Sequence, residues 1–206
     1  NQNANVERTT LGYIQAGASA ISVLTDNVFF GGSNEDLAMA RKFNFCPILR
    51  KDFTIGEYQI IESKSIGADA ILLIAAVLDP SELKQLAKLA HSLGLEVLIE
   101  VHDEDELLKS VDIGADLIGV NNRNLKTFEV STDTSKSLAP LIPGNVVKVS
   151  ESGISSPAAI IELRKFGYKG FLVGENFMKH ERPEVAANEF IQELNKLSMI
   201  ERISKT

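Results

Sequence analysis

The chain has 206 residues, of which 44% are hydrophobic and 24% charged, which is the size and composition of one folded domain with a substantial core. Its net charge of −7 argues against nucleic acid as a partner, because a phosphate backbone is bound by clustered Lys and Arg. The single cysteine, Cys46, excludes an internal disulfide and favours the cytoplasm, and no apolar run approaches the roughly 18–20 residues that cross a membrane.

Short apolar runs alternate with amphipathic stretches along the chain. The runs are rich in Val, Ile and Leu and do not alternate with polar residues, which is typical of parallel strands buried on both faces. They cover residues 20–26, 48–52, 70–76, 96–101, 117–122, 146–152 and 170–174.

The stretches between these runs predict helices, most clearly at 80–93, where apolar residues recur at spacings of three and four. Asp79 before Pro80 and Ser156 before Pro157 predict N-caps followed by proline in the first turn. Several helices end at a glycine just before a strand, where glycine adopts the left-handed conformation at low cost. These glycines are Gly17, Gly67, Gly94, Gly114 and Gly167. The recurring strand and helix predict parallel βαβ units.

The number of elements indicates a particular fold. Seven strands and eight helices are predicted, and the first helix, near residues 6–15, precedes every strand. A (β/α)8 TIM barrel begins with a strand. We therefore interpret residues 1–206 as a single α/β barrel domain with seven of its eight strands, N-terminally incomplete, and expect a longer native gene product. An open doubly wound sheet with a leading helix is the alternative.

Polar residues gather at the carboxyl ends of the predicted strands, where barrels carry their catalytic groups. Lys51, Glu100 and Asn121 each lie at such an end, and a charge or amide in an apolar strand is costly unless it is paired or used. Each has a structural alternative: Lys51 would pair with Glu100 or Asp52, and the asparagine would cap a turn. Polar residues end the strands predicted at 48–52, 96–101, 117–122 and 146–152, and the convergence of these four strands on one rim favours an active site.

Two glycine-containing segments follow the last two strands, Ser152-Gly153 and Gly174-Glu175. Many barrels bind a phosphate there through backbone N–H groups and the start of a short helix. The three histidines lack the spacing of metal ligands, so no metal site is predicted. His102 lies near the rim and is a candidate substrate contact.

Several segments carry a family pattern. They read Pro-Ile-Leu-Arg-Lys-Asp-Phe at 47–53, Glu-Val-Leu-Ile-Glu-Val-His at 96–102, Gly-Val-Asn-Asn-Arg-Asn-Leu at 119–125 and Val-Ser-Glu-Ser-Gly at 149–153. In these the chain resembles the indole-3-glycerol-phosphate synthases, from about residue 12 to about residue 178. The resemblance implies a lyase of tryptophan biosynthesis. It would close the indole ring of 1-(2-carboxyphenylamino)-1-deoxyribulose 5-phosphate with loss of CO₂ and water, without a cofactor.

The resemblance also implies roles for individual residues. Lys51 would be the general acid of ring closure, Glu100 the acid/base of dehydration, and Asn121 would orient substrate hydroxyls, supported by Arg123. Ser152 would contact the substrate. Main-chain N–H groups of Gly153, Gly174 and Glu175 would bind the phosphate, although some members have Ser at the position of Glu175. The expected apolar walls of the aryl site are Leu24, Phe30, Phe53, Leu72, Leu125 and Phe128.

One departure from the family is large. The family's first strand carries a Glu and a second catalytic Lys, followed by a phosphate-binding Ser, and the printed sequence contains none of them. We therefore expect the printed chain to be inactive or nearly so. Two alternatives stay open: another phosphosugar barrel, such as a phosphoribosylanthranilate isomerase, or a non-catalytic truncated barrel. A monomer is expected, with fusion to or association with other tryptophan-pathway enzymes left open.

Overall fold

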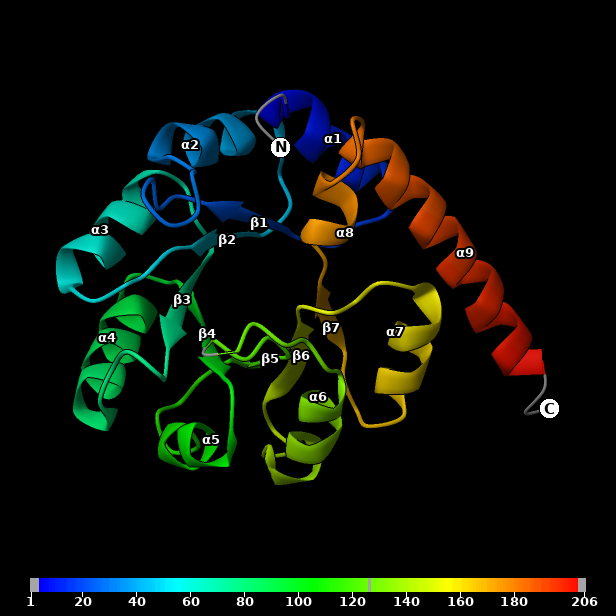
Figure 1. The fold of residues 1–206 in the computed structure, drawn as a ribbon. Helices are drawn as coiled ribbons and strands as arrows, with labels where there is room; N and C mark the ends of the chain where they lie inside the picture. The colour runs from blue at the N-terminus through cyan, green and yellow to red at the C-terminus, as the bar shows by residue number, and fades with distance from the viewer. Residues whose placement is uncertain (1–3, 126, 204–206) are drawn as a thin grey trace.

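Parallel strands form the centre of the molecule. In this computed structural model, which describes residues 4–125 and 127–203, seven strands lie around a central axis and helices surround them (Figure 1). Each strand pairs in parallel with its neighbours in sequence, so that the sheet order is the chain order. The strands are β1 (Ile21–Leu24), β2 (Ile48–Lys51), β3 (Ala70–Ile74), β4 (Glu96–Val101), β5 (Leu117–Asn121), β6 (Val147–Glu151) and β7 (Gly170–Leu172).

The predicted barrel class is confirmed, and the doubly wound alternative is wrong. A doubly wound sheet reverses its strand order at a switch point, whereas the order from β1 to β7 never reverses. Within residues 4–125 and 127–203, no pairing joins β7 to β1. Contacts between helices link the two ends of the sheet. Phe177 of α8 (Glu175–Met178), which follows β7, packs against Tyr13 of α1 (Val6–Ala16), which precedes β1, and against Phe190 of α9 (Pro183–Ile203).

The helices follow the predicted positions with one correction. They are α1, α2 (Asn34–Phe43), α3 (Glu57–Ser65), α4 (Pro80–Ser92), α5 (Glu104–Ser110), α6 (Asp133–Leu138), α7 (Pro157–Arg164), α8 and α9, with a 3-10 turn at Ala139–Leu141. The count of eight helices was wrong, because the last segment divides: α8 ends and Pro183 begins α9, which packs against α1 and α7 (Figure 1). No helix in the described ranges combines the length and apolarity needed to cross a membrane.

The predicted ends of helices are confirmed. Asp79 and Ser156 accept hydrogen bonds from the first turns of α4 and α7, and a proline follows each of them. All five glycines predicted to end helices have positive φ, from 67° at Gly94 to 109° at Gly17. Several strands are shorter than predicted, because Asp52, Asn122 and Ser152 already belong to the turns that leave the sheet.

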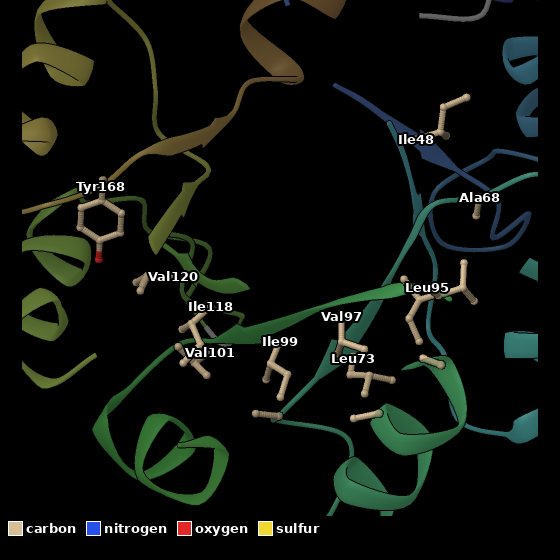
Figure 2. Close-up of a cluster of buried hydrophobic side chains, with 14 of the residues drawn as sticks. Ile48, Ala68, Leu73, Leu95, Val97, Ile99, Val101, Ile118, Val120 and Tyr168 are labelled. Atoms are coloured by element: carbon tan, nitrogen blue, oxygen red, sulfur yellow. The ribbon is translucent and has the colours of Figure 1, made fainter. Parts of the chain in front are cut away.

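The alternation of side chains along each strand divides the core in two. Leu49, Leu72, Ile74, Leu98 and Val149 point into the barrel and form an inner cluster. Their sequence neighbours point outward and pack under the helices. Figure 2 shows this outer cluster, with Leu73, Val97 and Ile99 between the strands and the surrounding helices. By the same alternation, each polar residue in these strands points either into the barrel or outward toward the helices.

Aspartates secure the amino-terminal end of the barrel at two places. Asp69, just before β3, accepts a hydrogen bond from Ile48 N of β2 at 2.8 Å through Oδ2. Asp116, just before β5, accepts one from Val97 N of β4, also at 2.8 Å. Arg41 pairs with Asp69, and His91 Nε2 lies 2.9 Å from Asp116 Oδ2. Each aspartate therefore ties two neighbouring strands at the end opposite the polar rim.

Arg50 points outward from β2 and is almost fully buried, with 3% of its surface exposed. Its Nη2 lies 3.0 Å from Asp52 Oδ2 and 2.8 Å from Glu62 Oε2. Nε and Nη1 donate to Thr25 Oγ1 and to groups of α3. All of the guanidinium's hydrogen-bonding directions are used, so Arg50 fixes the end of β2 to β1 and α3.

We expect Arg50→Met to lower the free energy of unfolding by about 3–5 kcal/mol, because it leaves Asp52 and Glu62 without their cation in a buried site. Urea unfolding followed by circular dichroism measures the loss. The exposed Arg164, whose guanidinium donates to Ser198 Oγ, provides the control, and Arg164→Met should change stability by no more than about 0.5 kcal/mol. Equal effects of the two substitutions would contradict the assignment.

Candidate active site

A lysine shared by two carboxylates lies at the carboxyl end of the barrel. Lys51 Nζ, at the end of β2, lies 2.9 Å from Glu100 Oε2 of β4 and 3.2 Å from Glu151 Oε2 of β6. All three side chains point inward, directly above Leu49, Leu98 and Val149 of the inner cluster. Lys51 keeps 21% of its side chain exposed while both carboxylates are buried, so the ammonium is the group that faces the barrel mouth.

Asn121 and Arg123 extend this arrangement. Asn121 Nδ2, at the end of β5, donates to Glu100 Oε1 at 3.1 Å, and its Oδ1 accepts from Arg123 N at 3.0 Å. Arg123 Nη2 pairs with Glu175 Oε2, which joins the loop after β5 to the start of α8. The structure therefore brings together Lys51, Glu100, Asn121 and Arg123, as expected, and adds Glu151.

The two charges of the Lys51–Glu100 pair support each other. Burial alone would lower the pKa of Lys51, but the charges of Glu151 and Glu100 outweigh it and raise that pKa. Burial would raise the pKa of Glu100, but the Lys51 charge and hydrogen bonds from Lys51 and Asn121 hold it below its ordinary value. The pair is therefore an ammonium and a carboxylate at neutral pH.

Glu151 is the residue that sequence reasoning missed. Burial, together with repulsion from Glu100, raises the pKa of Glu151 from 4.5 to about 7, despite the opposing charge of Lys51. Its Oε1 is buried and has no hydrogen-bond partner among the described residues. This oxygen lies over Gly119 of β5, where a side chain would overlap it. The sequence signal that could have identified Glu151 is its spacing from Val149: residues two apart on a strand point to the same side, and Val149 points inward.

Of the two ion pairs considered for Lys51, the one with Glu100 is present. Asp52 does not pair with Lys51, because it points outward and binds Arg50. Asn122 also points outward: its Nδ2 donates to Ser150 Oγ and Ser152 O, and its Oδ1 accepts from Ser135. Asn122 therefore has a structural role in the turn after β5, as considered for the asparagines, whereas Asn121 reaches the charged cluster.

Aromatic side chains stand beside the cluster on one side. Phe30 stacks on Phe53 with ring centroids 4.9 Å apart and planes 11° apart, and Phe29 meets Phe53 edge-on at 5.4 Å. Phe53, two residues after Lys51, also packs on the inner cluster. Phe29 was not predicted as part of this wall. Asp26 Oδ1 holds the loop by accepting from Phe29 N and Phe30 N.

The other predicted apolar contacts differ in exposure. Leu72 is fully buried in the inner cluster and lies in the floor beneath the charged layer. Leu24, at the end of β1, is 39% exposed. Leu125 and Phe128 are 51% and 68% exposed in the loop after β5, so they line no closed wall in this structure.

The segments predicted to bind phosphate follow β6 and β7. Ser152 and Gly153 both have positive φ, 62° and 72°, so the chain turns sharply as it leaves β6. Such a conformation is costly for a serine and is often retained at functional sites. A side chain at Gly153 would press on Val130 Cγ1 at 2.7 Å. Gly174 is the N-cap of α8, and Glu175 is its first residue.

These features define a TIM-barrel enzyme, with an acid/base cluster on the inner faces of its strands. The chain belongs to the indole-3-glycerol phosphate synthase family, whose sequence model matches residues 1–190. This confirms the resemblance.

Similar proteins agree with that membership. Indole-3-glycerol phosphate synthase of Bacteroides thetaiotaomicron is 48% identical over 191 residues, which cover 93% of this chain and 73% of that protein. The enzyme of the same name from a Polaromonas species is 50% identical over 84% of this chain and 66% of its own length. That of Nautilia profundicola is 50% identical over 82% and 65%. The chain thus spans about two thirds to three quarters of the length of these relatives.

Solved structures agree in fold alone. N-acetylmannosamine-6-phosphate 2-epimerase from Clostridium perfringens has a TM-score of 0.68 at 16% identity, over 91% of this chain and 84% of its own. KGPDC from Streptococcus mutans has a TM-score of 0.65 at 16% identity, over 93% and 95%.

Gly119→Ala should reduce activity while the barrel stays folded. The strand conformation of Gly119 suits alanine, but the new Cβ would overlap Glu151 Oε1 and push that carboxylate off Lys51. We expect at least about a tenfold fall in kcat, since displacing an active-site group by about 1 Å is costly. Gly144→Ala, in an open and exposed loop, is the matched control and should leave kcat unchanged. Wild-type turnover in Gly119→Ala would contradict a role for the position of Glu151.

Glu151 should also make stability depend on pH. Its pKa is about 7 in the folded protein and 4.5 ordinarily, so the folded protein binds the proton more tightly. Its contribution to stability is present below about pH 4.5 and is lost as the pH rises through about 7. Relative to Glu151→Gln, the wild-type free energy of unfolding should fall by on the order of 3 kcal/mol across this window. Urea titrations at several pH values measure the difference, and parallel curves would refute it.

Proposed function

We propose that this chain carries the site that closes the indole ring of 1-(2-carboxyphenylamino)-1-deoxyribulose 5-phosphate, with loss of CO₂ and water, in tryptophan biosynthesis. The observation that carries the proposal is Lys51 Nζ, held between Glu100 and Glu151 at the mouth of the barrel. Membership of the synthase family and the names of its relatives support the choice of substrate.

Ring closure needs a proton donor at the substrate's carbonyl oxygen, and Lys51 suits that step. Its ammonium is charged, partly exposed and fixed by two carboxylates, so it can protonate the oxygen as the aryl carbon attacks the carbonyl carbon. The arylamine supplies the electrons for this attack. Decarboxylation then restores the aromatic ring, and no cofactor is required by the electron count.

Dehydration needs a base and an acid near the new hydroxyl, and carboxylates with different pKa values suit these roles. Glu100 stays ionised beside Lys51 and Asn121 and can take a proton from the substrate. Asn121 would orient substrate hydroxyls, with Arg123 fixing its amide. Glu151, whose pKa is raised to about 7, is able to hold or release a proton at neutral pH.

The remaining surfaces suit the two ends of this substrate. The stacked pair Phe30 and Phe53, with Leu24 nearby and Leu72 below, offers an apolar site for the aryl ring. We assign Leu125 and Phe128 to the same site, reached by movement of their exposed loop. At the opposite side, Ser152 would contact the substrate, and N–H groups of Gly153, Gly174 and Glu175 would bind the phosphate.

The cellular compartment and the oligomeric state are also proposed. We propose that the protein acts in the cytoplasm as a monomer, either alone or joined to other tryptophan-pathway enzymes. The single cysteine is in keeping with a reducing compartment. Light scattering of the purified protein measures the mass, and a stable dimer would overturn the monomer.

The test of the activity uses the native protein, incubated with the carboxyphenylamino substrate while indole fluorescence is followed. Lys51→Ala should reduce kcat by at least about 100-fold, since it removes a general acid. Lys88→Ala, on the exposed face of α4, is the control and should keep full turnover. Circular dichroism verifies folding. Glu100→Gln is a second variant that removes one charge without leaving Lys51 unpaired. Wild-type turnover in Lys51→Ala would refute the role of this lysine.

A further inference from the structure

His102 lies immediately above the charged cluster and is used by none of the steps proposed so far. It follows β4 two residues after Glu100, so the alternation of the strand turns its ring inward as well. The side chain is only 11% exposed. Its Nε2 lies 3.4 Å from Glu100 Oε1, at an angle that makes no hydrogen bond, and is a buried polar atom without a hydrogen-bond partner in the described structure.

The other side of the ring is held by α5. His102 Nδ1 lies 3.0 Å from Glu106 Oε2, and the same oxygen accepts the backbone N–H of His102 at 2.7 Å. Asp103, the N-cap of α5, in turn accepts from Glu106 N at 2.9 Å. Glu106 is itself largely buried, with 15% of its side chain exposed. This clamp fixes the ring plane and keeps Nε2 aimed at Glu100.

The charges around His102 favour its protonated form. It faces Glu100 on its own strand, Glu106 on α5 and Glu151 on β6, while Lys51 of β2 lies on the far side of Glu100. Burial would lower the pKa of His102, but the hydrogen bond that its ring donates to Glu106 and the charges of Glu100, Glu106 and Glu151 outweigh burial and raise that pKa above 6.5.

We propose that His102 is a positioning residue for Glu100. Clamped by Glu106, the imidazolium holds a positive charge beside Glu100 Oε1 and keeps that carboxylate ionised and oriented for its proton-transfer step. The proposal rests on the proposed function for its catalytic consequence. The ion-pair chain Glu106–His102–Glu100 rests on the contacts of the ring with both carboxylates and on the protonated form that these carboxylates favour.

A consequence for the reaction follows. When the pH rises through the ionisation of His102, the positive charge beside Glu100 Oε1 is lost, and Glu100 keeps only Asn121 and Lys51 as partners. Lys51 stays charged over this range, but Glu151, whose pKa is about 7, also loses its proton as the pH rises. The part of an alkaline fall in kcat that is assigned to His102 is therefore the part that disappears when His102 is substituted.

The first experiment needs no turnover. The chain has three histidines, His91, His102 and His180, so their imidazole NMR signals can be assigned from single His→Gln variants. The signal of His102 should titrate above 6.5, and Glu100→Gln and Glu106→Gln should each lower its midpoint. Asp116→Asn, which alters the partner of His91, is the control and should leave His102 unchanged. If Glu100→Gln leaves the titration midpoint of His102 unchanged, the proposal is overturned.

The second experiment separates charge from shape. His102→Asn keeps an amide where Nδ1 meets Glu106, His102→Gln keeps one where Nε2 meets Glu100, and neither titrates. Both should have a smaller alkaline fall in kcat than the wild type, with little change in KM, and their plateau kcat should drop by less than the about 100-fold expected for loss of a general acid or base. His91→Gln should keep the wild-type profile. An alkaline limb with the wild-type midpoint and amplitude in both His102 variants would overturn the proposal. A wild-type protein without turnover would count against the proposed function alone, because the NMR titration still decides the ion-pair chain.

Discussion

The strands of this barrel turn alternate side chains inward and outward, and this constraint decides what each polar residue does. Arg50 and Lys51 are adjacent in sequence and both basic, yet Arg50 joins the sheet to α3 while Lys51 faces the barrel mouth. The same division separates Asn121 from Asn122. Structural bracing and chemistry therefore come from the same short segments without competing for the same space.

The inner layer is short of positive charge. The buried carboxylates of Glu100 and Glu151 lie above the apolar side chains of the inner cluster, and Lys51 is the cation that contacts both of them. One ammonium shared by two carboxylates does not stabilise both equally, so the pKa of Glu100 is lowered and that of Glu151 is raised. Different protonation states at two similar groups are what a multistep acid/base reaction requires.

Much of this could be predicted from the sequence, because barrels repeat a simple pattern. Apolar runs, N-caps such as Asp79 and glycines such as Gly94 located the strands and helix ends to within two residues or so. Lys51, Glu100 and Asn121 were found because each is polar at the end of an apolar run. Glu151 was missed because it stands between two serines, where no contrast marks the inward residue. Contacts between distant loops, such as Phe29 on Phe53 and Arg123 with Glu175, have no local signature.

The aspartate ties at the amino-terminal end have a consequence for how such a protein can change. Asp69 and Asp116 join neighbouring strands where no substrate group is expected, and every group of the charged cluster lies at the other end. These ties are thus made by residues that take no part in the charged cluster and lie at the opposite end of the strands. Loops at the reactive pole can therefore be lengthened, exchanged or given new side chains over generations, while the frame that aligns them keeps its geometry.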